Sequence, residues 1–461
     1  MRLSRYTSFV ADYPEPGQHL TFNWMTQAMA VLDDELRQLV EAPGSFDAAL
    51  IPPELAQQLE RMGILVEDEV DERQEIEHWH SQVRNNRRTF KAMVMTTYDC
   101  NFACTYCVEE GVKRPVKLGH TQAERTVRWI IERMEEQGSE KLYLNFYGGE
   151  PLLNVAGLEQ VAGPLLAYTQ ARGLEFDGSV TTNGALLHRR NAERLARVGV
   201  TMAKVTLDGD QEAHDQKRPF KGGHGSFELI MRNLEEVWDL IEIRLAGNVD
   251  CQNIHAVPKL MNYLEERGLG EKIGGIQFNG ISSQARDGFE HHQKGLLQIE
   301  SPEPLLQIEA VERTLDTPTQ SGNREDLFEL NHEAAQRGLP ARKAITASLC
   351  LLNQEENAVV IDPLGKIYKC PALVGHEAFI VGDLSQGEIH YDHLRIYGED
   401  LEGCLDCKWF TVCGGGCRFM SFLKSGDIRH KDCNKEFFDQ YGNEMVKMDY
   451  EIFLKEHGEP V

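Results

Sequence analysis

The 461-residue sequence lacks the features that would place a protein in a membrane or on nucleic acid. No apolar run is long enough to span a bilayer, and the stretch from Met1 to Tyr6 has no hydrophobic segment of the secretory-signal type. Basic residues are also few: 48 Lys and Arg against 73 Asp and Glu give a net charge of −25, whereas a nucleic-acid binder needs a basic surface. We therefore expect a cytoplasmic protein that binds neither membrane nor nucleic acid.

Cysteine, by contrast, is plentiful, with 11 residues. In a cytoplasmic chain this favours metal ligands over disulfides. Three of them form the motif Cys100-x3-Cys104-x2-Cys107. Three thiolates in one short loop fit a cubane iron–sulfur cluster with one iron left open. The alternative is a zinc knuckle that takes a fourth ligand from elsewhere, since a structural zinc site normally has four.

The region around this motif alternates between strand and helix patterns, which indicates parallel βα units. The predicted strands are residues 92–97, 141–147, 175–182, 201–207, 241–250 and 275–279. The amphipathic segments between them include residues 121–136, 190–197, 227–240 and 256–266. Six such units predict an α/β fold, a partial (β/α)6 barrel whose functional residues lie at the C-terminal strand ends.

Distinctive residues follow several of these strands. Gly148, Gly149 and Glu150 follow the second, and we interpret them as a close-approach site with an anion for a ligand amine. Later strand ends carry polar groups suited to ribose hydroxyls or a carboxylate: Thr182, Asn183, Asp208 and, a little further on, Arg218. Asn-Gly and Asp-Gly are ordinary turn signals, but turns alone do not explain their placement at successive strand ends.

The N-terminal residues predict a small separate α+β domain. Residues 6–10 and 19–24 read as strands, residues 30–41 and 53–61 as helices, and residues 63–66 as a short closing strand. This pattern fits a winged-helix-like peptide-binding module, and the alternative is a structural extension. Residues 67–88 read as a solvated helix or linker.

Seven cysteines form the second cluster signal. Cys350 and Cys370 flank a predicted hairpin around Gly365, and the spacing Cys404-x2-Cys407-x5-Cys413-x3-Cys417 is followed by Cys433. Glycines 414–416 allow backbone amides to approach cluster sulfurs. Seven thiolates cannot fill two four-cysteine sites, so one position is open or taken by another group. Paired zinc ribbons are the alternative.

Together, the cysteine loop, the Gly-Gly-Glu-Pro and the partial barrel resemble the radical S-adenosylmethionine (SAM) enzymes. The C-terminal spacing resembles the SPASM extension, and the two resemblances cover roughly residues 90–435. The opening Leu3-Ser4-Arg5-Tyr6 with its small domain resembles peptide maturases of the geopeptide maturase group. The implied domains are 1–75 (leader-peptide binding), 76–90 (linker), 91–280 (barrel), 281–344 (bridge), 345–435 (SPASM) and 436–461 (C-terminal helix).

The resemblance implies roles for the residues in the barrel. Cys100, Cys104 and Cys107 would hold a 4Fe–4S cluster whose open iron chelates SAM. Gly148, Gly149 and Glu150 would hold the methionine amine. Thr182, Asn183, Asp208 and Arg218 would hold ribose or carboxylate. Reduction would cleave SAM to a 5′-deoxyadenosyl radical that takes hydrogen from the substrate, while the barrel orients it and excludes water.

The resemblance also implies two auxiliary 4Fe–4S clusters. Cys404, Cys407, Cys413 and Cys433 would hold the outer one, and Cys350, Cys370 and Cys417 the inner one, with an iron open to a substrate thiolate. Cys251 is read as a buried thiol, with a fourth ligand as the alternative.

The leading reaction is therefore a Cys-to-carbon thioether in a ribosomal precursor peptide bound through its leader, with a reductant such as flavodoxin or ferredoxin. The alternatives are formylglycine formation on a sulfatase, carbon–carbon crosslinking and epimerisation. Two alternatives of a different class are a non-catalytic electron-transfer protein and a zinc-binding scaffold.

Overall fold

The computed structural model describes residues 1–42, 44, 46–250, 252–280, 350–353 and 357–457. Cys251 and the predicted bridge, residues 281–344, lie outside the described residues. No helix in the described part of the chain is both long enough and apolar enough to cross a membrane.

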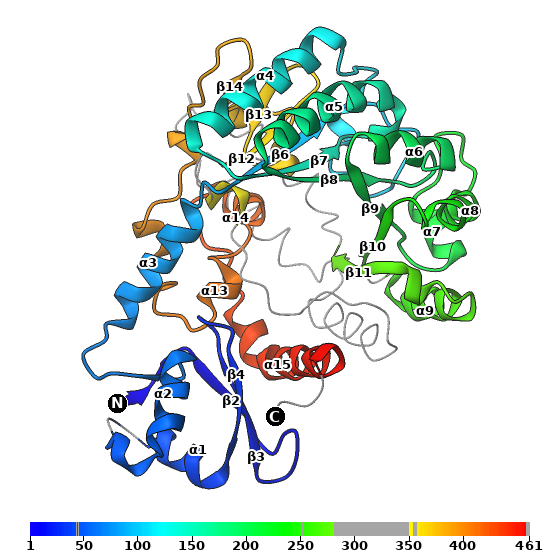
Figure 1. Ribbon diagram of the computed structural model, residues 1–461. Coiled ribbons are helices and arrows are strands. Elements are labelled where there is room, and N and C mark those ends of the chain that lie inside the picture. The colour runs from blue at the N-terminus through cyan, green and yellow to red at the C-terminus, as the bar shows by residue number, and fades with distance from the viewer. Residues whose placement is uncertain (43, 45, 251, 281–349, 354–356, 458–461) are drawn as a thin grey trace.

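Six parallel strands form the centre of the fold (Figure 1). In sheet order they are β11 (Ile273–Gly280), β10 (Glu242–Val249), β9 (Val200–Thr206), β8 (Glu175–Thr182), β7 (Lys141–Tyr147) and β6 (Thr89–Met95). The covering helices are α4 (His120–Gln137), α5 (Val155–Arg172), α6 (Arg189–Arg197), α7 (Gln211–Lys217), α8 (Phe227–Val237) and α9 (Val257–Glu266). These helices bury the outer face of the sheet, and every one of the six strands contributes apolar residues to the core beneath them. The predicted partial barrel is confirmed.

The C-terminal region extends this same sheet. Strand β12 (Ala358–Ile361) pairs in parallel with β6, and β13 (Lys366–Tyr368) and β14 (Gly382–Asp383) follow in antiparallel order. The predicted hairpin around Gly365 therefore lies beside the first barrel strand. Tyr98, just after β6, is buried and donates a hydrogen bond to Asp362 at the hairpin turn (2.5 Å). The cysteine-rich region is thus attached to the strand that precedes the first cysteine loop.

The N-terminal region contains a three-stranded antiparallel sheet of β2 (Thr7–Val10), β3 (Gln18–Asn23) and β4 (Met29–Asp33). The helices α1 (Asp34–Glu41) and α2 (Pro53–Arg61) follow, and β5 (Leu65–Val66) pairs with β1 (Arg2–Leu3). The predicted helix over residues 30–41 is wrong in its first turn, because residues 30–33 pair with β3. The helix begins only after Asp33, whose carboxylate caps it by accepting from the Leu36 amide (2.8 Å).

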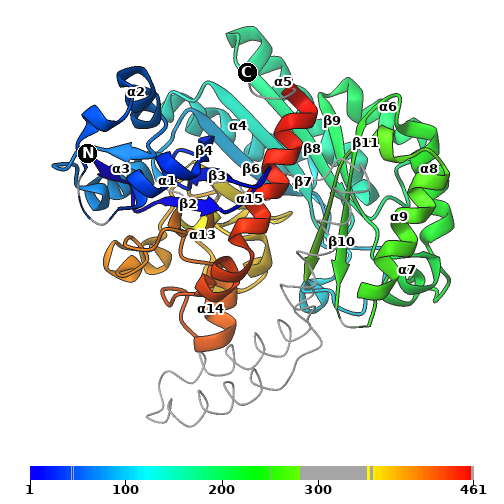
Figure 2. The same cartoon turned by 90° about the horizontal axis from the view of Figure 1, so that it is seen from below.

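This sheet is packed on both faces. One face meets α1 and α2 through a small core that includes Leu32, Val40 and Leu59. The other face meets the C-terminal helices α13 (Phe410–Cys413) and α15 (Lys435–His457). Trp24 packs edge-on against Trp409, with ring centroids 4.4 Å apart. Figure 2 shows α15 crossing beside β2, β3 and β4. The N-terminal sheet therefore shares a core with the cysteine-rich region.

Two further helices connect these parts. Helix α3 (Glu72–Arg84) crosses the predicted boundary at residue 75 and enters the segment predicted as a linker. Helix α14 (Arg418–Ser425) begins directly after Cys417. In Figure 1, α13 and α14 lie between the barrel and the N-terminal sheet.

Candidate active site

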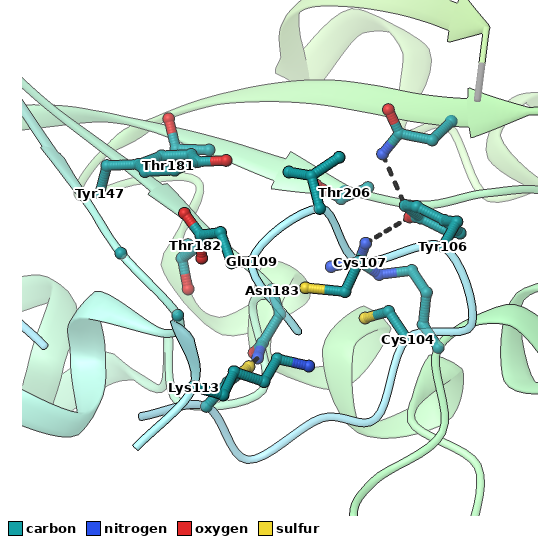
Figure 3. Close-up of a pocket in the computed structure, with 16 residues that line it drawn as sticks. Cys104, Tyr106, Cys107, Glu109, Lys113, Tyr147, Thr181, Thr182, Asn183 and Thr206 are labelled. Carbon is teal, nitrogen blue, oxygen red and sulfur yellow. Dashed lines mark hydrogen bonds between the residues drawn. The ribbon is translucent and has the colours of Figure 1, made fainter. Parts of the chain in front are cut away.

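Three cysteines from one loop line a cavity at the C-terminal ends of the barrel strands. Cys100, Cys104 and Cys107 follow β6 and border a cavity of about 250 Å³. The other lining residues come from the later strand ends and the same loop: Tyr106, Val108, Glu109, Lys113, Tyr147, Gly148, Gly149, Thr181, Thr182, Asn183, Thr206, Arg218 and Asn248. Figure 3 shows Cys104 and Cys107 turned toward the same space, with Glu109 and Asn183 beside them.

The cysteine loop is held by the segment after α7. The amides of Ala103 and Thr105 donate to the carbonyls of Pro219 (2.9 Å) and Lys217 (3.0 Å). Phe102 packs edge-on against Phe220, with ring centroids 4.7 Å apart. The loop is therefore fixed by the segment that ends α7 and follows it.

The thiols fit a cubane cluster by their number and spread. In the part of the chain that the structure describes, no three Cys, His, Asp or Glu side chains converge on one point as ligands of a single metal ion. In a cubane each cysteine binds a different iron, so three thiols around one cavity are the expected arrangement. Burial raises the pKa of the Cys107 thiol, and a metal offsets this because it holds a coordinating thiol deprotonated.

The two glycines bring the end of β7 against the cysteine loop. A Cβ on Gly148 would lie 2.4 Å from the Thr97 carbonyl oxygen, and one on Gly149 would lie 2.3 Å from that of Asp99. The Gly149 amide donates to Thr97 (3.1 Å), and both glycines also line the cavity. The two glycines therefore allow the backbone to approach the cysteine loop closely, and they leave room for a ligand in the cavity.

The Glu150 carboxylate, which the sequence predicts as an anion for a ligand amine, is engaged by neighbouring donors in this structure. Glu150 is fully buried and is absent from the residues that line the cavity. One oxygen accepts from Thr182 Oγ1 (2.7 Å) and the Leu152 amide (3.0 Å), and the other from the Asn183 amide (2.8 Å). Burial raises its pKa and these three donors lower it. Glu150 therefore fixes the neighbouring strand end.

Thr182 and Asn183 do reach the cavity. Asn183 Nδ2 donates to Asn101 Oδ1 (2.8 Å) in the cysteine loop and lies 4.0 Å from Cys100 Sγ. Its position is set by Glu150 on one side and by the cysteine loop on the other. Asn183 thus connects the thiol loop to the end of β8.

Arg218 lines the cavity, while Asp208 lies one layer behind it. Arg218 donates to the Tyr106 hydroxyl (2.5 Å), which donates to Asp208 (2.5 Å). Asn248 Nδ2 also donates to Tyr106 (3.2 Å). Burial raises the pKa of Asp208, while the Arg218 charge lowers it. Asp208 therefore orients Tyr106 and balances Arg218, and of these two charged residues it is Arg218 that faces the cavity.

Sequence reasoning did not single out Tyr106 or Glu109. Both lie inside the cysteine motif or two residues past it, and their polar character in a short buried loop is the signal that could have found them. Glu109 is buried, and its Oε1 has no hydrogen-bond partner among the residues that the structure describes. Burial raises its pKa to about 7 although Lys113 opposes the shift. The cavity thus contains a carboxylate with an uncommitted oxygen.

The C-terminal cysteines gather in two groups. Cys404, Cys407, Cys413 and Cys433 line one cavity of about 710 Å³, which we call the four-cysteine cavity. Cys350, Cys370 and Cys417 form the three-cysteine group. Burial raises the pKa of the Cys370 thiol, and the neighbouring Cys350 and Cys417 raise it further, which shows that the three lie near one another. Each set of donors has the chemistry of a cubane site.

Comparison with known proteins identifies the class. Residues 94–248 match the Radical SAM superfamily. Residues 94–248 are therefore a radical SAM domain, and the chain is a SAM-dependent iron–sulfur enzyme, which sets aside the non-catalytic and zinc-scaffold alternatives.

Among individual relatives, the mycofactocin maturase MftC of Mycolicibacterium smegmatis is 26% identical over 344 residues, covering 71% of this chain and 77% of that protein. The AdoMet-dependent heme synthase of Nitratidesulfovibrio vulgaris is 28% identical over 360 residues, covering 72% and 88%. The structure of native anSMEcpe with bound AdoMet and Cp18Cys peptide has a TM-score of 0.55 at 19% identity, covering 78% of this chain and 99% of that one. This last likeness shows the shared fold.

Proposed function

We propose that this radical SAM enzyme matures a ribosomally synthesised precursor peptide by joining a cysteine sulfur to a substrate carbon as a thioether. The similarity to a mycofactocin maturase supports a peptide substrate. A heme synthase is similar to the same extent, so the choice of a peptide rests also on the N-terminal sheet and the C-terminal cysteines of this chain.

The three-cysteine group is the observation that carries the thioether proposal. Cys350, Cys370 and Cys417 lie together, and the sequence has no further cysteine between Cys350 and Cys370. A cubane held there by three thiols would have one iron able to take up the thiolate of a substrate cysteine. The four-cysteine cavity provides the donors for a second, fully ligated cluster.

The proposed reaction balances as an oxidation. The substrate carbon loses one hydrogen atom, the thiol loses its proton, and sulfur and carbon form a bond. The one remaining electron would pass to an auxiliary iron–sulfur cluster. In the barrel, the bound cluster and SAM supply the hydrogen-abstracting chemistry. A reductant such as flavodoxin or ferredoxin supplies the starting electron.

The residues of the chain itself bind and orient. Cys100, Cys104 and Cys107 hold the first cluster, and Gly148, Gly149, Thr182, Asn183 and Arg218 border the space where SAM binds. Arg218 offers a buried positive charge to a carboxylate. Glu150 and Asp208 act through these neighbours, by holding the end of β8 and the Tyr106 hydroxyl.

The N-terminal sheet provides a place for the leader. Among the strands that the structure describes, β4 pairs with β3 on one side only, which leaves the other edge for an added strand. A leader bound there would lie on the sheet that shares its core with the cysteine-rich region. Leader binding is thereby linked to the part of the chain that holds the auxiliary clusters.

Product mass tests this proposal. The enzyme would be reconstituted anaerobically with iron and sulfide, reduced, and given SAM with the small cysteine-containing peptide encoded nearest its gene. Loss of a pair of hydrogens with a thiol that no longer alkylates supports the thioether. The same loss with free thiols indicates carbon–carbon crosslinking, an unchanged mass indicates epimerisation or a different peptide, and conversion of cysteine to formylglycine indicates sulfatase-type maturation.

A further inference from the structure

Arg418 is a fully buried arginine at the start of α14, directly after Cys417. Its Nη1 donates to the carbonyls of Arg429 (3.1 Å) and His430 (2.8 Å). Its Nε and Nη2 are buried without a hydrogen-bond partner in the part of the chain that the structure describes. A buried guanidinium with unused donors is costly unless an anion completes it, so this side chain indicates a missing negative partner.

The charged groups around Arg418 come from both C-terminal cysteine groups. Arg418 directly follows Cys417 of the three-cysteine group, and the charged groups that act on its guanidinium are Cys350, Cys404, Asp400 and Cys413. Cys350 belongs to the three-cysteine group, and Cys404 and Cys413 line the four-cysteine cavity. The guanidinium therefore lies between the two groups.

Gly415 shows how close the guanidinium comes to the four-cysteine cavity. This glycine lines that cavity, and a Cβ built on it would lie 2.8 Å from Arg418 Nη2. Its φ of +82° also favours glycine. Nη2 therefore lies beside a residue of the cavity wall.

A purely structural role explains one part of this arrangement. The two bonds from Nη1 hold the chain before Asp432 and Cys433, which any buried donor at this place could do. These two bonds do not explain why Nε and Nη2 are buried without partners. They also do not explain why no carboxylate among the described residues lies within ion-pair distance of Arg418. Cluster sulfurs are negative and accept N–H hydrogen bonds, and such bonds and charges set the reduction potential of a cluster.

We propose that Arg418 is a positive group shared by the two auxiliary clusters, donating hydrogen bonds from Nε and Nη2 to their sulfurs and raising both reduction potentials. This inference rests on the proposed auxiliary clusters. Arg418 is a positioning and tuning residue, which makes each cluster a better electron acceptor without touching the substrate.

The test uses the full chain reconstituted with iron and sulfide, and compares Arg418→Met, Arg418→Lys and the matched control Arg194→Met. Arg194 is a partly buried arginine of α6 that pairs with Glu159 in the barrel. Redox titration followed by electron paramagnetic resonance would measure each cluster. For Arg418→Met we expect the reduction equilibrium constants of the auxiliary clusters to fall at least about tenfold, which is ~59 mV for one electron. The first cluster, and all clusters of Arg194→Met, should be unchanged.

A second readout does not depend on whether the methionine variant folds. In chain labelled with ¹⁵N-arginine, pulsed resonance should detect ¹⁵N coupled to a reduced auxiliary cluster, and Arg418→Lys should abolish that coupling. Auxiliary clusters that are present without this coupling, or an Arg418→Met protein that loads fully at unchanged potentials, would overturn the role of Arg418 alone. Wild-type protein that holds iron for only one cubane would overturn the auxiliary clusters and the proposed function with them.

Discussion

Replacing Glu150 by Gln separates two ways in which this residue could serve SAM. If the carboxylate acted directly on the methionine amine, Glu150→Gln would abolish SAM binding and leave the fold unchanged. In the structure it instead accepts three hydrogen bonds that hold Thr182 and Asn183 in place. The substitution should then act mainly on stability.

The magnitude follows from those three bonds. In its best placement the Gln oxygen replaces Oε1 and keeps the bonds from Thr182 and the Leu152 amide. The Gln amide group then faces the Asn183 amide, donor against donor. Losing one charged hydrogen bond and leaving a buried donor unpaired costs about 2–4 kcal/mol. Because burial raises the pKa of Glu150, a neutral side chain relieves part of this cost, and we expect about 2 kcal/mol, the lower end of that range.

The assay is anaerobic urea denaturation of the reconstituted enzyme alongside equilibrium dialysis with labelled SAM. Glu150→Gln should lower the free energy of unfolding and weaken SAM binding without abolishing it. The control Glu135→Gln removes an exposed ion pair with Arg172 and should change stability by less than ~1 kcal/mol. Unchanged stability together with complete loss of SAM binding would refute the positioning role.

Three further changes test other parts of the account. Cys104→Ala should lose the iron of the first cluster and produce no deoxyadenosine, and full SAM cleavage would contradict the assignment. Gly149→Ala places a Cβ 2.3 Å from a carbonyl oxygen of the cysteine loop and should cost about 1–3 kcal/mol and impair iron loading. The control is Gly163→Ala in α5, where the nearest atom to the added Cβ lies at 3.7 Å, and this variant should stabilise the fold by up to ~1 kcal/mol. Equal iron loading in the two glycine variants would count against the close contact at Gly149. Burial lowers the pKa of His80 from 6.5 to about 4. Between pH 6.5 and pH 4 the unfolded chain therefore binds a proton that the folded chain does not, and the free energy of unfolding falls by about 3 kcal/mol as the pH drops through this range. His80→Gln should flatten this pH dependence of denaturation, and identical curves would contradict it.

Local patterns predicted the barrel well because each strand carries its own signal. Strands β7 and β8 lie where the sequence placed them, each followed by glycines or short polar residues. The helix prediction for residues 30–33 was wrong because a short apolar run fits a helix and a strand equally. Only pairing with β3, a contact between separate segments, decides for the strand.

The parts that the sequence did not reveal depend on contacts between distant segments. Nothing local in residues 358–361 indicates that they pair with β6. The motif containing Glu150 was located correctly, but the direction of its side chain is decided by donors from the next strand end. Tyr106 matters because Asp208, Arg218 and Asn248 converge on its hydroxyl. Residue type and spacing thus identified where the chemistry lies, and packing decided which atoms face it.

The central claim is that this chain takes hydrogen from a peptide. The most direct measurement uses the precursor peptide deuterated at carbon, with the reduced, cluster-loaded enzyme and SAM, and follows deuterium in the deoxyadenosine formed. We expect deuterated deoxyadenosine together with a peptide that has lost a pair of hydrogens. Deoxyadenosine that stays free of deuterium, beside an unmodified peptide, would contradict it.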